Sequence, residues 1–565
     1  MLNFYDFEVF RHDWLVVIIN PIEKTTNVIV NDKNLLEEYY EQHKNEIWIG
    51  YNSQRYDQYI LKAILLDMDP KPLNDWIIVD NKNGWQYSSL LRKIPLNNYD
   101  VMYRNDRGLK SLEGFMGNNI KETSVDFNIQ RKLTRDEINE TIKYCRHDVE
   151  QTIEVFLNRQ EDFDAQMGLI KMFNLPLSNI SKSKAQLSAH ILDAHRVSNR
   201  GDEFNIHMPS TLRISKYKHV VDWYLNEENH DYKKSLVTNV AGVETVFGWG
   251  GIHSAIPKYH GKGYFINMDV TSLYPSMMIQ YNLHSRNIVD PQKFVDIYDS
   301  RVKYKREKNP LQLPLKTLLN STYGAMKDKN NNLYDPLMAN NVCIHGQMFL
   351  LDLMEKLEPY CQIIQSNTDG ILIKIDSLND FDTIDDIVWE WEQRTHLQME
   401  FDMYKEVYQK DVNNYVAVMF DGTHKSKGSY VKKLNDLDYD MPIINRAMIE
   451  FMTKGIDPMQ TIDGCNDLRM FQKIVKLTGK YKFAWHNREE LTEKCFRVFA
   501  SKSKSDTYIG KCKTHGATIE KFGNTPDNCF IDNDDVKNKA VTRKLDKSWY
   551  YNTAIDRLRQ FGLEV

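Results

Sequence analysis

The 565-residue sequence is poor in cysteine, and none of its seven cysteines belongs to a Cys-x-x-Cys pair. This argues against a disulfide framework, and the spacing of Cys495, Cys512 and His515 fits no common zinc module. No apolar run approaches the ~20 residues of a membrane span, and the first residues show no signal-peptide pattern. We therefore expect an intracellular protein with reduced thiols and no membrane partner.

The sequence also lacks internal repeats, linkers rich in Pro, Gly or Ser, and a strong charge of one sign. The formal net charge of −5 neither favours nor excludes a nucleic-acid partner, because a large enzyme can confine basic charge to one cleft. Hydrophobic residues make up 42% of the chain and aromatic residues 12%. A chain of this length and content exceeds a single core, so we expect several folded domains.

Strand and helix patterns alternate in the first third of the chain. Residues 14–19 form an apolar run typical of a buried strand, and residues 47–51 predict another strand. Thr134 and Glu137 form a capping box, which predicts a long helix over residues 134–157. This alternation predicts an α/β domain.

The middle of the chain predicts two helices and a hairpin. The helices cover residues 291–308 and 313–327 and are separated by Asn309-Pro310. Residues 361–375 predict a β-hairpin whose turn is formed by residues 367–369.

The first group of candidate catalytic residues is acidic. Asp6 and Glu8 lie two apart on a predicted strand and therefore share one face. Asp57 and Asp148 follow, and Tyr144 lies one helical turn before Asp148. Four acids and a phenol can hold two Mg²⁺ ions and orient a water for phosphodiester cleavage. Taken singly, each pair would be an ordinary strand edge or helix pair.

A second pair of acids lies further along the chain. Asp269 ends a predicted strand, and Asp369 lies at the tip of the predicted hairpin. Two acids on adjacent strands suit a two-metal site for nucleotidyl transfer. Ser272, Leu273 and Tyr274 belong to the tight turn after Asp269, whose backbone N–H groups can face a triphosphate. Asp369 alone would be an ordinary Asp-Gly hairpin turn.

Basic and aromatic residues lie between these two acids. Lys316, Asn320 and Tyr323 share one face of a predicted helix, where a lysine can meet phosphates and a tyrosine ring can meet a base. Arg301 and Lys305 are one turn apart on the preceding helix. They either add charge to the same site or form a solvated basic face.

The order Asp-x-Glu, Asn-x₃-Tyr-Asp and Tyr-x₃-Asp resembles the three motifs of DEDD-type proofreading exonucleases, which have a ribonuclease-H-like fold. The resemblance implies that Tyr144 aligns the attacking water and that Asn52 holds a single-stranded 3′ end. The implied metal ligands are Asp6, Glu8, Asp57 and Asp148. A strand-gripping motif of phage members resembles Ser111-Leu112-x-x-Phe115.

Asp-x₂-Ser-Leu-Tyr-Pro-Ser, Lys-x₃-Asn-Ser-x-Tyr-Gly and the Asn-Thr-Asp hairpin resemble motifs A, B and C of family B (alpha-like) DNA polymerases, most closely the compact bacteriophage members. The resemblance implies two Mg²⁺ ions per active site, replaceable by Mn²⁺, with Asp269, Val270 and Asp369 as polymerase ligands. It also implies that Lys316 neutralises the incoming phosphates, that Tyr274 excludes a 2′-hydroxyl, and that Tyr323 lines the nascent base pair.

Three segments depart from the family pattern. Asn367 replaces the usual first acid of motif C, and Gly248-Trp249-Gly250-Gly251 resembles a Tyr-x-Gly-Gly segment whose tyrosine is missing. Tyr415 matches a segment that touches the primer end, but the basic residues before it are absent. We expect Lys425 and Lys427 to supply that charge. Basic loops at residues 501–513 either grip duplex phosphates or only aid solubility.

The resemblance implies an α/β and α+β multidomain fold with a ribonuclease-H-like exonuclease and a right-hand polymerase. The expected ranges are exonuclease 1–185, palm 186–285 and 341–450, fingers 286–340 and thumb 451–565. Expected partners are primer–template DNA, dNTPs and a processivity or single-strand-binding factor, and the expected form is a monomer. If the chain is phage-encoded, it acts in the cytoplasm of an infected bacterium.

Two alternatives stay open. A protein-primed phage polymerase would carry an insertion between motifs A and B, but Asp269 and Lys316 are only 47 residues apart. The second alternative is a nuclease whose polymerase half is vestigial. Asn367 suggests it, because this residue replaces the usual acid of motif C.

Overall fold

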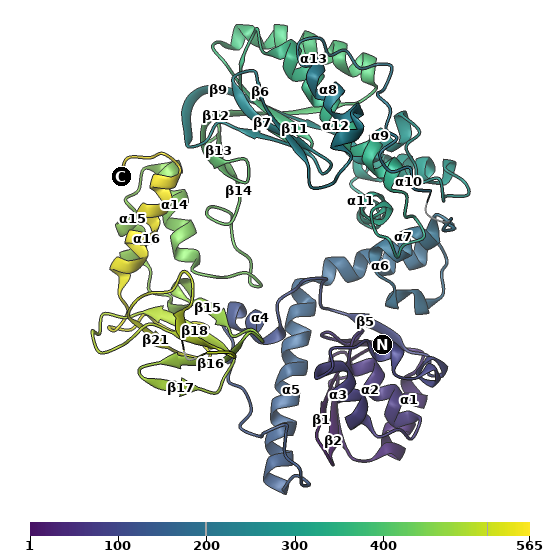
Figure 1. The fold of residues 1–565 in the computed structure, drawn as a ribbon. Helices are drawn as coiled ribbons and strands as arrows, with labels where there is room; N and C mark the ends of the chain where they lie inside the picture. The colour runs from purple at the N-terminus through teal and green to yellow at the C-terminus, as the bar shows by residue number, and fades with distance from the viewer. Residues whose placement is uncertain (198–199, 517) are drawn as a thin grey trace. The chain divides into compact units, whose positions relative to one another are not determined.

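The computed structural model describes residues 1–197, 200–516 and 518–565, which form two compact units (Figure 1). The first unit comprises Met1–Ser183, Leu434–Pro442 and Cys465–Trp549. The second comprises Lys184–Lys433, Ile443–Gly464 and Tyr550–Val565. Both units combine helices with sheets, which confirms the expected mixed α/β and α+β multidomain class.

The first unit is built on a five-stranded sheet in the order β3-β2-β1-β4-β5. The first three strands are antiparallel, whereas β4 and β5 run parallel to β1, as expected of a ribonuclease-H-like sheet. The strands are β1 (Leu2–Val9), β2 (Trp14–Asn20), β3 (Thr25–Val30), β4 (Ile47–Gly50) and β5 (Asn97–Asp100).

Helices cover both faces of this sheet. Tyr5 and Phe7 of β1 enter a core shared with α1 (Lys33–His43), α2 (Asp57–Leu65) and α3 (Pro70–Ile78). Phe4, which points the opposite way, packs edge-on against Phe156 of α5 (Arg135–Asn158) at 5.2 Å between ring centroids. Asp6 and Glu8 share the face of Phe4 and therefore face α5. The Thr134–Glu137 capping box forms as predicted.

Two small sheets from the segment Cys465–Trp549 complete the first unit. Their orders are β15-β18-β21 and β17-β16-β19-β20. Helix α4 (Leu109–Met116) packs against β15 and β18, and α6 (Gln160–Met172) follows α5. The strands are β15 (Lys473–Lys476), β16 (Tyr481–His486), β17 (Glu489–Leu491), β18 (Cys495–Ala500), β19 (Gly510–Lys513), β20 (Ile519–Lys521) and β21 (Cys529–Ile531).

The second unit contains an antiparallel nine-stranded sheet in the order β14-β13-β12-β9-β11-β10-β8-β7-β6. Strand β9, which ends in Asp269-Val270, lies between β11 and β12, so its last residues are held from both sides. The strands are β6 (Ser235–Val240), β7 (Val243–Gly248), β8 (Ile252–Ala255), β9 (Tyr259–Val270), β10 (Gln362–Asn367), β11 (Gly370–Ile375), β12 (Met399–Asp411), β13 (Asn414–Met419) and β14 (His424–Lys427).

The predicted hairpin is confirmed as β10 and β11, and the two predicted helices as α10 (Gln292–Arg306) and α11 (Gln312–Met326). Within the described residues, no helix is both long and apolar enough to cross a membrane. The other helices are α7 (Lys184–Ile191), α8 (Lys218–Leu225), α9 (Leu273–Gln280), α12 (Pro336–Leu357), α13 (Phe381–Thr395), α14 (Pro442–Lys454), α15 (Pro458–Gly464) and α16 (Lys547–Gln560).

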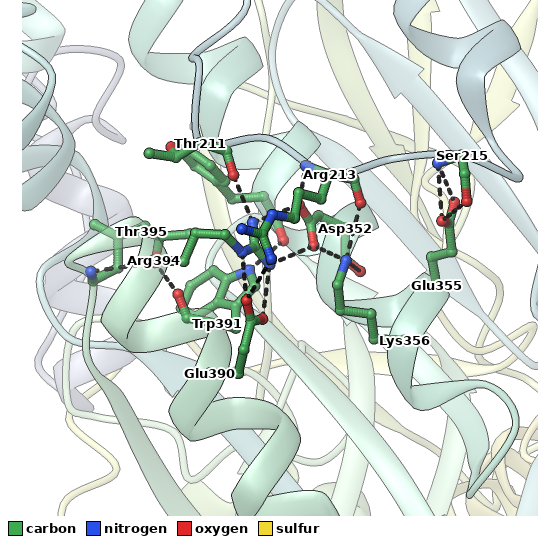
Figure 2. A network of polar contacts seen from close by, with 12 residues as sticks. Thr211, Arg213, Ser215, Asp352, Glu355, Lys356, Glu390, Trp391, Arg394 and Thr395 are labelled. Atoms are coloured by element: carbon green, nitrogen blue, oxygen red, sulfur yellow. Dashed lines mark hydrogen bonds and ion pairs between the residues drawn. The ribbon is translucent and has the colours of Figure 1, made fainter.

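A polar network joins helices α12 and α13 of the second unit (Figure 2). The Asp352 carboxylate on α12 is fully buried, and Arg394 of α13 donates to both of its oxygens at 3.0 Å. The backbone amide of Arg213 donates to Asp352 Oδ2 at 2.6 Å, and Arg394 also donates to the carbonyl of Thr211 at 2.6 Å. Because each buried charge has partners, the network holds α12, α13 and the segment before α8 together.

Candidate active sites

Strand β1 and helices α2 and α5 bring four carboxylates of the first unit together. Asp57 opens α2, is 2% exposed, and its Oδ1 accepts a hydrogen bond from the Phe7 amide at 3.1 Å. Asp6 and Glu8 come from β1, and Asp148 comes from α5. The charges of Asp57 and Asp148 act on both Asp6 and Glu8, so the four acids that the sequence singled out lie near one another. Asp6 and Glu8 form a close group with Cys145, and Asp148 forms another with Glu113 and His147.

Burial raises the pKa of each of these carboxyls, and the charge of at least one nearby carboxylate raises it further. Burial is the largest cause in every case, and it raises the pKa of Asp57 to about 7 and that of Asp148 to about 6. The pKa of Asp6 is raised further by Asp57, and that of Glu8 by Asp148. Crowded negative charge with little water is what a hard divalent cation relieves, so this all-oxygen donor set fits Mg²⁺.

A lysine that sequence reasoning missed lies inside the same cluster. Lys110 Nζ, from the first turn of α4, donates to Asp148 Oδ1 at 2.7 Å and to Glu113 Oε2 at 3.0 Å. It also lies 4.6 Å from the centre of the Tyr144 ring. Its charge opposes the rise in the pKa values of Asp148 and Glu8. The only sequence signal was its place directly before the Ser111-Leu112 motif.

Two further neighbours of the cluster were also missed. The thiol of Cys145 donates to the Asp6 carbonyl at 3.3 Å, and its sulfur lies within 4.8 Å of carboxylate oxygens of Asp6 and Glu8. His147 Nε2 lies 3.3 Å from Glu113 Oε2.

The predicted Tyr144 is protonated beside this cluster. Burial is the largest cause that raises the pKa of its hydroxyl, and the charge of Asp148 is the next, so the hydroxyl is neutral at pH 7 and can donate a hydrogen bond.

The predicted DNA-gripping residues of the first unit differ in exposure. Asn52 is half-buried in a turn with φ of 64°, and its backbone amide donates to Asp100 Oδ1 at 2.8 Å. Ser111, Leu112 and Phe115 are all interior residues of α4, with 4% exposure or less. Their contact with a DNA strand therefore stays a prediction, and in this structure their side chains serve the packing of α4.

In the second unit, the β9–β11 ladder brings Asp269 beside Asp369. Asp269 is paired with Gly370, and the Val270 amide donates to the Asp369 carbonyl at 2.8 Å. Partial burial, and next the charge of Asp369, raise the pKa of Asp269. Both side chains are open to solvent. The two acids that the sequence placed on neighbouring strands therefore lie side by side in a place that a ligand can reach.

The neighbouring strands surround this pair with further polar groups. Asp402 of β12, which sequence reasoning missed, forms an ion pair with Lys425 of β14. Tyr415 is paired with Lys427 across the β13–β14 ladder. Burial is the largest cause that raises the pKa of Tyr415. The charges of Asp269, Asp369 and Asp402 raise this pKa further, which indicates that the Tyr415 hydroxyl lies near all three acids. Lys425 in turn lowers the pKa of Asp269.

Helices α9 and α11 bring two predicted dNTP residues into contact. The rings of Tyr274 and Tyr323 lie 4.1 Å apart between centroids at an interplanar angle of 32°. The buried hydroxyl of Tyr323 has no hydrogen-bond partner within the described part of the chain. Leu273 is buried and fits against Gly346 of α12, which anchors the start of α9.

The basic residues of α10 and α11 differ in their side-chain partners and in their exposure. Arg301 donates to the Ser272 hydroxyl at 2.7 Å, and Lys305 lies 3.5 Å from Glu400 in an exposed ion pair. Lys316 and Asn320 are exposed on the same face of α11 as Tyr323. Arg301 is thus fixed beside the turn that follows Asp269, whereas Lys316 is open to solvent.

Comparison with known proteins adds two curated relatives, while no family model matches the chain. DNA polymerase 1 of Saccharolobus solfataricus is 26% identical over 292 residues, covering 42% of this chain and 32% of the relative. DNA polymerase 1 of Sulfolobus acidocaldarius is 24% identical over 247 residues, covering 40% of this chain and 26% of the relative. Both relatives are DNA polymerases.

The matched regions span no more than 32% of either relative's length. Among solved structures, the family B DNA polymerase of the hyperthermophilic archaeon Pyrobaculum calidifontis is similar with a TM-score of 0.43 and 12% sequence identity. That similarity covers 100% of this chain and 78% of the archaeal one.

Proposed function

We propose that the chain is a DNA-directed DNA polymerase that extends a primer on a template with dNTPs and removes nucleotides from 3′ ends. The observation that carries the proposal is the position of Asp269, at the end of β9, beside Asp369 in the β10–β11 turn, where the Val270 amide donates to the Asp369 carbonyl at 2.8 Å. The contacting rings of Tyr274 and Tyr323 lie on the helices that follow in the same unit. The two curated relatives named as DNA polymerases support the same activity.

In the polymerase site, Asp269, Asp369 and the Val270 carbonyl would hold two Mg²⁺ ions. Such ions would supply Lewis acidity for the primer 3′-hydroxyl and for the charge on the departing pyrophosphate. Lys316, on the exposed face of α11, would meet the phosphates of the incoming dNTP. Tyr274, supported by the Tyr323 ring, would fill the space of a ribose 2′-hydroxyl.

In the exonuclease site, Asp6, Glu8, Asp57 and Asp148 would hold the metals. The neutral Tyr144 hydroxyl would orient the attacking water, and Asn52 would hold the single-stranded end. Lys110, fixed by its ion pair with Asp148, would offset negative charge beside the scissile phosphate. We propose 1–185 as the exonuclease, 186–285 and 341–450 as palm, 286–340 as fingers and 451–565 as thumb.

A labelled primer on a longer template tests the proposal. With Mg²⁺ and four dNTPs, we expect products longer than the primer. Without dNTPs, we expect shorter products from its 3′ end. A primer unchanged under both conditions would contradict the proposal.

A nuclease with a vestigial polymerase half is the second candidate, favoured by Asn367 in place of the usual acid. Shortening of the primer under both conditions, with Mg²⁺ or with Mn²⁺, would support it. The phage origin and an accessory replication factor stay predictions.

A further inference from the structure

The C-terminal end of helix α4 is held by residues more than 350 positions away in the chain. Arg469 donates through Nε and Nη2 to the Phe115 carbonyl at 3.1 and 2.7 Å. Gln472 Nε2 donates to the same carbonyl at 3.0 Å. The last carbonyls of a helix lack partners within the helix, so these side chains act as an external cap.

A buried arginine completes this cap. Arg497 on β18 is 0% exposed, and its Nη2 donates to the carbonyls of Gly114 at 3.2 Å and Asn118 at 2.6 Å. Its Nε donates to Gln472 Oε1 at 3.0 Å, so the residues of the cap are also bonded to each other. A buried guanidinium is costly unless its N–H groups are satisfied, which ties Arg497 to the present position of α4.

Three glycines show how closely α4 lies against the segment Cys465–Trp549. A Cβ on Gly114 would lie 2.9 Å from Ile474 Cδ1, and one on Gly117 would lie 2.9 Å from Arg469 Cδ. A Cβ on Gly108 would collide with the ammonium group of Lys476. An added methyl group on Gly114 therefore requires the Ile474 side chain or α4 itself to shift.

The helix held in this way carries Lys110 to the acidic cluster. Lys110 lies on the first turn of α4 and donates to Asp148 Oδ1 at 2.7 Å. Glu113, on the same helix, accepts from Lys110 and lies 3.3 Å from His147. A displacement of α4 would therefore move Lys110 relative to Asp148.

We propose that Arg469, Gln472 and Arg497 are positioning residues of the exonuclease, which act through α4 by holding Lys110 against Asp148. The inference rests on the proposed exonuclease function. It gives the segment Cys465–Trp549, which lies within the range proposed as thumb, a role in the geometry of the nuclease site.

A double-mutant cycle on the full chain tests whether Arg469 acts through Lys110. Single-turnover degradation of a single-stranded oligonucleotide with Mg²⁺ is compared for Arg469→Ala, Lys110→Met and the double variant. We expect each single change to slow degradation roughly tenfold, and the double variant to be no slower than Lys110→Met. Independent losses that multiply to roughly a hundredfold would overturn the inference.

Two matched variants separate the cap from the ion pair that Arg469 also makes. Asp436→Ala removes the carboxylate that lies 2.7 Å from Arg469 Nη2 and leaves the bonds from Arg469 to the Phe115 carbonyl. We therefore expect wild-type degradation from this variant. Arg469→Lys retains a donor and should recover part of the rate that Arg469→Ala loses. A loss in Asp436→Ala equal to that in Arg469→Ala would overturn the role of the cap.

Gly114→Ala tests the same inference from the other side of the contact. Alanine favours a helix over glycine by about 1 kcal/mol, so helix propensity alone predicts no loss. We expect slower degradation, because the new methyl group meets Ile474, and partial recovery in Gly114→Ala/Ile474→Val, which lacks Cδ1. A wild-type rate in Gly114→Ala would contradict the close packing.

Hydrogen exchange supplies a readout that needs neither metal nor substrate. In metal-free protein, Arg469→Ala should speed amide exchange in residues 109–116 and leave α5 unchanged. If Asp6→Ala does not slow degradation, the proposed exonuclease fails, whatever α4 does. If Asp6→Ala stops degradation but Arg469→Ala changes neither rate nor exchange, the positioning inference alone fails.

Discussion

Gly370 lies opposite Asp269 in the β9–β11 ladder, so close that a Cβ on Gly370 would lie 2.1 Å from Asp269 Oδ1. Gly370→Ala must therefore displace the Asp269 carboxylate or the strand. Because misplacement of a catalytic group by about 1 Å can cost 10²-fold, we expect primer extension to fall by that order and 3′-end degradation to persist. Gly464→Ala, with no atom within 4 Å of the new Cβ, is the matched control. Wild-type extension in Gly370→Ala would contradict a catalytic position for Asp269.

The contact between Tyr274 and Tyr323 predicts a change in sugar selection. Tyr274→Ala removes the ring proposed to occupy the space of a 2′-hydroxyl, so incorporation of ATP relative to dATP should rise. Tyr323→Phe keeps the ring contact at 4.1 Å and loses only a hydroxyl without a partner. It should therefore retain wild-type discrimination. An unchanged ATP-to-dATP ratio in Tyr274→Ala would remove Tyr274 from this role.

Asn367→Asp predicts a lower metal requirement for extension. The Asn367 Oδ1 atom accepts from the Thr368 amide at 2.9 Å, and a carboxylate oxygen can accept the same bond. The added charge near Asp369 should therefore favour divalent binding and lower the Mg²⁺ concentration for half-maximal extension. A Mg²⁺ titration checks this. A raised requirement or lost extension would show that the site is built around the amide.

The acidic cluster predicts that the first unit loses stability as pH rises when metal is absent. The pKa values of Asp57, about 7, and Asp148, about 6, exceed the ordinary value of an aspartate. The folded state therefore holds more protons than the unfolded chain between about pH 4 and 7, and the free energy of unfolding falls across that window.

Thermal melts in EDTA from pH 5 to pH 8 measure this effect. We expect Tm to fall by at least about 2–4 °C, which is the shift that a loss of about 1 kcal/mol produces in a domain of about 150–250 residues. Mg²⁺ should restore most of the loss at pH 8, and Asp57→Asn should flatten the pH dependence. A Tm that rises with pH by the same amount in wild type and Asp57→Asn would contradict the electrostatic account.

Local signals were sufficient to predict several elements. Thr134 and Glu137 cap α5 through bonds that span three residues, and the turn at Asp369 needs only its own hairpin. Motif spacing likewise led to the acids of both clusters. These features depend on neighbours in sequence, or on a pairing that a short turn enforces.

Lys110 and Arg497 could not be placed from local signals. Lys110 meets Asp148 only because α4 crosses α5, and that crossing depends on contacts with residues more than 350 positions away. One sequence signal does point to Arg497, because it is the one charged residue in the otherwise apolar strand Cys495–Ala500. Most partners of its guanidinium, however, are backbone carbonyls, which have no sequence signature, and its side-chain partner, Gln472, belongs to another segment of the chain.

We propose that one chain holds two independent metal-dependent sites, one for synthesis and one for degradation. Primer extension and 3′-end degradation are measured for Asp269→Ala and for Asp6→Ala with Glu8→Ala. We predict that Asp269→Ala degrades but does not extend, and that the double variant extends but does not degrade. Loss of both activities in either variant, or extension by Asp269→Ala, would contradict the account.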